Sequence, residues 1–164
     1  MRVRAAAVAF LLSILPATTQ AQSDSPAAVT FGGGWAAFAD EGRIDHGALG
    51  IGAEWRALPH LAIGPEIHYM TGPGDDRDLF VIGVARVGIL DLRSRVAPFV
   101  TLGGGLMTQS ATFGRSSYSS TEGAFIVGGG ARINVSSRVF VAPELTMGWE
   151  PHIRTSVTVG VRFP

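Results

Sequence analysis

Several stretches of this sequence combine residue types that could do chemistry. In AAVTF followed by GGGWAA, the residues Gly32, Gly34 and Ala37 match the G-x-G-x-x-A pattern of a dinucleotide-binding loop. Glu54 follows about 20 residues later, where such loops have an acidic residue. The loop must, however, lead into a helix whose N-terminus faces the pyrophosphate. Because Gly42 interrupts the segment WAAFADEG, we expect no such helix and no bound cofactor.

The acidic segment DDRD, residues 75–78, could hold a divalent cation through its carboxylates. It lacks the ligand spacing and the glycine of a calcium-binding loop. A solvated acidic loop explains the segment more simply, so we expect no metal site.

Hydrolysis would need a serine, a histidine and an acid brought together. None of the four histidines is followed by serine at the His-x-Ser spacing of barrel lipases that deacylate lipid A. His152 and Ser156 would share one face of a strand, but the rise per residue places them more than ~12 Å apart. We therefore expect no catalytic residues and keep a lipid-modifying hydrolase only as a less favoured alternative.

The elements that must position these residues show a period of two, which is typical of strands. In HIRTSVTVGVRF, for example, Val157, Val159 and Val161 share one face, while Thr158 and Arg162 share the other. Eight such strands are expected, at about residues 27–39, 48–58, 61–70, 79–90, 97–110, 122–135, 139–149 and 152–163. No segment between them has a convincing helical period.

These strands are longer than the 5–6 residues common in soluble sheets and match the 9–11 residues needed to cross a bilayer. Tight connections around Pro59, at 91–96 and at 136–138 alternate with longer polar ones at 40–47, 71–78 and 114–121. Short turns at one end and longer loops at the other are typical of an outer-membrane barrel. A secreted soluble sandwich or lipocalin-like barrel is the alternative.

Two features favour the membrane barrel. The bulky apolar face can be followed along nearly every strand, opposite a face of small, polar and charged residues. Large aromatic residues lie on this apolar face near strand ends, as in an interfacial girdle; they are Trp35, Trp55, Tyr69, Trp149 and Phe163. We therefore predict an all-β fold, an eight-stranded antiparallel up-and-down transmembrane β-barrel.

Ionisable residues in mid-strand all lie on the small or polar face. An Arg that faced lipid at the bilayer midplane would cost about 2–4 kcal/mol. We therefore expect these residues to point into the lumen and to form a charge network there. Its predicted members are Glu54, Arg56, Glu66, Arg86, Arg132, Glu144 and Arg162, with His68 and Arg154 also facing inward. An eight-stranded interior is just wide enough for side chains, so a structural plug is favoured over an ion path.

The chain ends and composition set further bounds. Residues 1–21 are predicted to be a cleaved signal peptide, because MRVR precedes an apolar stretch and a small-residue cleavage region ending at Ala21. Residues 22–164 would then form the barrel domain. Without a basic stripe, nucleic acid is not an expected partner, and without cysteine no thiol chemistry is possible.

The strands VAPFVTLGGGL and RVFVAPELTMGW and the closing TVGVRF resemble the small outer-membrane β-barrel family, which includes the barrel domain of outer-membrane protein A. The resemblance covers the mature chain, but Pro164 follows the terminal aromatic Phe163, where the family usually ends. It implies a monomer in the cell outer membrane with a structural or surface-interaction role. Outer-membrane lipids and lipopolysaccharide are the expected partners, and a small porin-like, ion-conducting pore is the first alternative.

The glycine triplets 103–105 and 128–130 are expected inside adjacent strands, because phosphate-binding loops end a strand rather than lie within one. Glycine there would leave lumen space for charged side chains and let a small barrel bend tightly.

Overall fold

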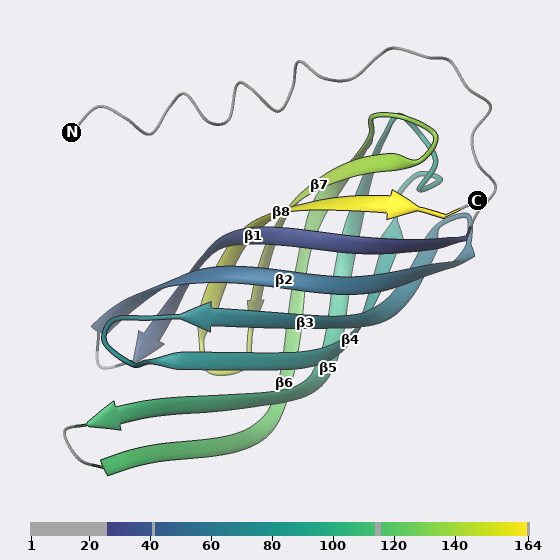
Figure 1. Ribbon diagram of the computed structural model, residues 1–164. Helices are drawn as coiled ribbons and strands as arrows, with labels where there is room; N and C mark the ends of the chain where they lie inside the picture. Colours follow the sequence, from purple (N-terminus) through teal and green to yellow (C-terminus); the bar gives the residue numbers. More distant parts are fainter. Residues whose placement is uncertain (1–25, 41, 114–115, 164) are drawn as a thin grey trace, which may run out of the picture.

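The computed structural model describes residues 26–40, 42–113 and 116–163, which form a closed antiparallel barrel of eight strands (Figure 1). The strands are β1 (Ala27–Asp40), β2 (Gly42–Leu58), β3 (Leu61–Thr71), β4 (Arg77–Gly88), β5 (Val96–Phe113), β6 (Ser116–Asn134), β7 (Val139–Gly148) and β8 (His152–Arg162). Each strand pairs with its neighbours in sequence, and β1 pairs with β8 to close the barrel. The expected fold class and strand number are confirmed.

Both the start of β1 and the end of β8 lie at one end of the barrel, which we call the termini end (Figure 1). The opposite end, the distal end, carries the β1–β2, β3–β4, β5–β6 and β7–β8 connections. Within the described residues, no helix is long and apolar enough to cross a membrane.

Alternating side chains divide the barrel into an apolar outer surface and a mixed interior. Large apolar side chains point outward on every strand, including Phe31, Ile51, Ile67, Val81, Leu102, Phe125, Leu145 and Val157. In water this continuous apolar belt would be an exposed patch far larger than a soluble monomer tolerates. In a bilayer it is the lipid-facing surface of the barrel.

The interior has three layers. One apolar cluster near the distal end contains Phe38, Met70, Phe80, Ile82 and Met107, with Ala36, Ala48, Val84, Ala124 and Ile126. A second, near the termini end, contains Leu92, Phe99 and Phe140 with Ala28, Ala62, Ala97 and Ala142. Ionisable side chains lie between the two clusters: along β3, Glu66 is flanked by Ala62 and Met70.

The prediction of long loops at the distal end was partly wrong. Strand β2 begins at Gly42 rather than near residue 48, and β6 begins at Ser116 rather than near residue 122. Among the described distal connections only β3–β4, residues 72–76, is a longer loop, and the β4–β5 connection at the termini end, residues 89–95, is longer than the tight turn expected there. Backbone hydrogen bonds between neighbouring strands do not require apolar side chains. The strands therefore extend beyond the segments in which apolar and polar residues alternate.

The glycine triplets lie inside strands, as predicted. A Cβ at Gly105 would overlap the carbonyl oxygen of Val81 on the next strand, and one at Gly128 would overlap that of Leu145. At Gly130 a Cβ would lie 2.9 Å from the ring of Phe99. The triplets therefore allow close approach of neighbouring backbones and of interior side chains.

Candidate functional site: a charged layer inside the barrel

Arg86 of β4 is the centre of the interior charged layer. Its guanidinium nitrogen Nη1 donates to Glu66 Oε1 on β3 at 2.6 Å, and Nη2 donates to Glu144 Oε2 on β7 at 2.9 Å. Nη1 also lies 3.9 Å from Glu54 Oε2 on β2. One buried arginine therefore links three carboxylates from separate strands, as the forked geometry of guanidinium allows.

Further contacts extend this layer. Arg132 Nη2 on β6 donates to Glu54 Oε2 at 2.5 Å, and the guanidinium also stacks on the ring of Phe140 at 4.1 Å. The Thr101 hydroxyl donates to the second oxygen of Glu144. His68 Nε2 lies 3.0 Å from Glu66 Oε2. The three glutamates thus each have at least one polar partner inside the barrel.

Two of the predicted members lie nearer the termini end than this layer. Arg162 is half-buried near the termini end, where it donates to Asn134 Oδ1 and to the Ser137 carbonyl and stacks on Phe140. Arg56 is also half-buried, towards the termini end of β2. The structure therefore brings Glu54, Glu66, Arg86, Arg132 and Glu144 together. It places Arg56 and Arg162 nearer the termini end.

Arg154 of β8 belongs to the same layer and is 1% exposed. Its Nε and Nη1 atoms have no hydrogen-bond partner among the described residues. A cavity of about 20 Å³ beside it is lined by Glu66, His68 and Thr30, among others. A space of this size can hold one water molecule, which could satisfy the free donors.

Sequence reasoning missed the neutral residues of this site. Thr101 and Phe140 lie on the inward faces of β5 and β7, where Thr101 contacts Glu144 and Phe140 contacts Arg132. Alternation indicates that each faces inward, but the partner of each depends on the stagger between strands. The stagger between strands cannot be read from the spacing of residues in the sequence.

A second cavity, of about 540 Å³, lies at the distal end. Its lining includes His46 and the acidic residues Asp75, Asp76, Asp78 and Glu150. Asp78 lies beyond Leu79, the last outward-facing apolar residue of β4, and so outside the belt. Burial raises the pKa of Asp78 to about 6, and the neighbouring Asp76 carboxylate acts in the same direction. The distal cavity is therefore an acidic site that favours cations.

A closed eight-stranded barrel with an apolar belt and a charged interior defines the class of small outer-membrane β-barrels. No model of a known protein family matches the sequence, and no curated protein matches it. Solved structures of this class do match.

Neisserial surface protein A superposes with a TM-score of 0.75 at 18% identity, covering 85% of this chain and 98% of that one. The N-terminal barrel domain of OprF from Pseudomonas aeruginosa gives a TM-score of 0.65 at 12% identity, covering 85% and 98%. Ail, the attachment invasion locus protein of Yersinia pestis, gives 0.60 at 11%, covering 85% and 99%. The chain thus has the fold of the eight-stranded outer-membrane barrels, and the resemblance inferred from its strands is confirmed at the level of the fold.

Proposed function

We propose that this protein is a plugged outer-membrane barrel with a structural or surface-interaction role and no catalytic activity. The observation that carries this proposal is the bridging of Glu66 and Glu144 by Arg86 across the lumen. Two apolar clusters lie on either side of this bridge. An ion crossing the barrel would have to break a buried ion pair and also pass both apolar layers.

The energetics support a plug. Breaking a buried ion pair by removing one partner typically costs about 3–5 kcal/mol. Here the carboxylates of Glu66 and Glu144 share one guanidinium, and both side chains are less than a tenth exposed. A transient opening of both contacts at once would therefore be rare.

Conductance in planar lipid bilayers tests the plug against the small-pore alternative. The wild-type protein, purified from membranes, should give no single-channel steps. Steady steps whose size changes in Glu66→Ala or Glu144→Ala would overturn the plug and support a pore. Arg77→Ala, on the same strand as Arg86 but exposed, is the matched control and should behave as the wild type.

The proposed surface role rests on the distal end. Strands β5 and β6 pair with each other as far as Phe113 and Ser116, whereas β7 pairs with β6 only from Ile126. The end of this hairpin therefore extends beyond its neighbours (Figure 1). Such a ribbon would stand outside the bilayer, where it could contact lipopolysaccharide or another cell.

The solved neighbours also include Ail in complex with the heparin analogue sucrose octasulfate, at a TM-score of 0.56 and 11% identity. The acidic distal cavity of this chain is unsuited to a polysulfated ligand. We therefore favour a cationic or cation-bridged partner over a polyanion.

A hydrolase is not favoured, because no serine hydroxyl is hydrogen-bonded to a histidine among the described residues. His46 and His68 lie against carboxylates, and the His152 ring lies against the Trp149 and Glu150 carbonyls.

The proposed membrane location is tested by heat-modifiable migration of the outer-membrane fraction on a denaturing gel. A protein found soluble in the periplasm would overturn the whole proposal.

A further inference from the structure

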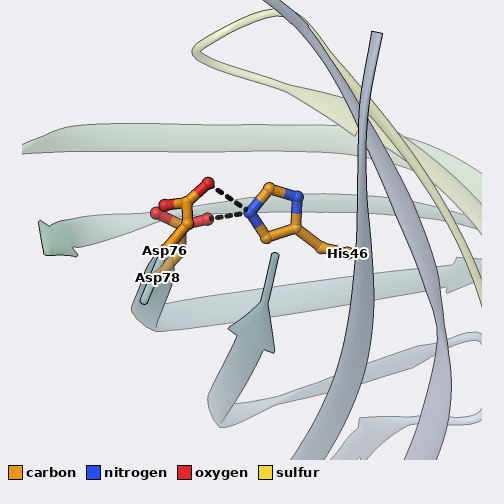
Figure 2. A group of neighbouring side chains, drawn as sticks. All are labelled: His46, Asp76 and Asp78. Carbon is orange, nitrogen blue, oxygen red and sulfur yellow. Dashed lines mark hydrogen bonds and ion pairs between the residues drawn. The ribbon is translucent and has the colours of Figure 1, made fainter. Parts of the chain in front are cut away.

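At the distal end, a histidine and two aspartates from separate parts of the chain converge on one point (Figure 2). His46 comes from β2, Asp76 from the β3–β4 loop and Asp78 from the start of β4. His46 Nε2 lies 3.0 Å from Asp76 Oδ2 and 3.3 Å from Asp78 Oδ2. We propose that these three side chains form a binding site for a divalent metal ion of the zinc class.

The spacing of the donor atoms suits a metal. Zinc bonds of about 2.0–2.1 Å in tetrahedral geometry place neighbouring ligand atoms roughly 3.3 Å apart. One potential ligand atom from each of the three residues lies within 4.8 Å of the other two. Small rotations of the two carboxylates would therefore complete three positions of a coordination shell.

A glycine lies directly against the convergence point and allows the donor atoms to come close to the backbone. A Cβ on Gly72 would overlap His46 Nε2 and would lie 2.9 Å from Asp76 Oδ2. Gly72 does not have the positive φ of Gly74, so its backbone conformation does not require glycine. Glycine at position 72 therefore lets His46 Nε2 and Asp76 Oδ2 lie directly against the backbone of the β3–β4 connection, where a larger residue would displace them.

The charges and burial of the cluster also favour a cation. His46 and Asp78 are each 3% exposed. A neutral imidazole has one N–H, so Nε2 can donate to only one of the two carboxylates that it faces. A metal ion that replaces the proton on Nε2 would bind the imidazole and both carboxylates, and the remaining imidazole proton would lie on Nδ1, which is buried without a hydrogen-bond partner among the described residues.

The surroundings orient the histidine and provide access. The Phe38 ring packs edge-on against the His46 ring at 4.7 Å and restricts its rotation. The acidic distal cavity opens onto all three donors and has room for water ligands.

One imidazole with two carboxylates suits zinc or manganese, whereas calcium prefers six to eight oxygen ligands. This inference goes beyond the proposed function and does not depend on whether the lumen conducts.

The test is titration of the purified, untagged barrel with ZnCl₂ against a chromophoric chelator, so that no affinity tag contributes ligands. The wild type should bind one Zn²⁺ per chain. Asp78→Asn and His46→Gln should each lower the affinity at least tenfold, and Gly72→Ala should do the same because its methyl group displaces the His46 imidazole and the Asp76 carboxylate. Excess CaCl₂ should not displace the bound zinc.

Asp75→Asn is the matched control, because Asp75 lies in the same loop but its side chain is 61% exposed and outside the cluster. It should bind zinc as the wild type does. Heat-modifiable migration must show that each variant forms the barrel. Co²⁺ provides a second readout: the folded wild type should show its absorption bands, and folded Asp78→Asn should not. Absence of stoichiometric binding, displacement by calcium, or equal affinity in Asp75→Asn and Asp78→Asn would overturn the proposal.

Discussion

At the scale of single residues, Arg86 shows why arginine rather than lysine fills this interior. Its two terminal nitrogens donate to Glu66 on one side and Glu144 on the other. The planar guanidinium group donates hydrogen bonds in fixed directions and can therefore bind two carboxylates at once. The single ammonium group of lysine does this less well. The sequence has no lysine at all, so all its fixed side-chain cations have this geometry.

Replacing Arg86 should therefore destabilise the barrel. In Arg86→Met the carboxylates of Glu66 and Glu144 lose a shared partner while they stay buried, at a cost of about 3–5 kcal/mol. Urea unfolding in detergent micelles, followed by heat-modifiable migration, measures this loss. Arg77→Met removes an exposed arginine of the same strand and should cost at most about 1 kcal/mol. Equal midpoints for the two variants would contradict the assigned role of Arg86.

At the scale of elements, the glycine triplet of β5 contains two different kinds of position. Gly105 faces inward and is pressed against β4, where a Cβ would overlap the Val81 carbonyl oxygen. Gly104 faces outward, and a Cβ there would meet its nearest atom at 3.8 Å. At Gly103, the other inward glycine, a Cβ would lie 3.1 Å from the Gly83 carbonyl oxygen, so the close approach of β4 and β5 depends most on Gly105, less on Gly103 and not on Gly104.

This difference can be tested with two alanine substitutions. Gly105→Ala should lower the free energy of unfolding by about 1–3 kcal/mol, because the added methyl group forces the two backbones apart. Gly104→Ala should change it by much less, since the outward methyl group makes only an ordinary van der Waals contact. Urea midpoints of the two variants in the same detergent give the comparison. A larger loss in Gly104→Ala than in Gly105→Ala would refute this account of the triplet.

At the scale of the whole molecule, the apolar belt makes the barrel a membrane protein. Its outward side chains are residues that a soluble β-domain would place inside, and charges occupy the interior instead. Leu102, half exposed in mid-strand, pairs in register with Ala85 and Val127 on the neighbouring strands. It therefore lies well within the belt.

An arginine in the belt should be costly. Leu102→Arg should reduce stability in phospholipid bilayers by about 2–4 kcal/mol, because the charge faces hydrocarbon. Ser119→Arg, on the exposed distal extension of β6, should change it by less than about 1 kcal/mol. Reversible unfolding from liposomes measures both. Two equal, small effects would mean that Leu102 does not face lipid.

The sequence by itself determined the barrel. Period-two alternation over eight long segments indicated the strands, their number and which face of each is apolar, because these properties depend on local side-chain order. The same alternation placed Glu66, Arg86 and Glu144 in the interior. It underestimated the lengths of β2 and β6, because the hydrogen bonds between strands continue where the apolar pattern has ended.

Only the tertiary structure decided which inward residues meet. The contact between Arg86 and Glu144 joins residues 58 positions apart in the chain, and it depends on the stagger between strands around the closed barrel. In the same way, the sequence of the acidic segment 75–78 indicated only a solvated loop. The fold places His46 next to two of its carboxylates. Local periodicity specifies the direction of a side chain, whereas its partner is set by the register of all the strands together.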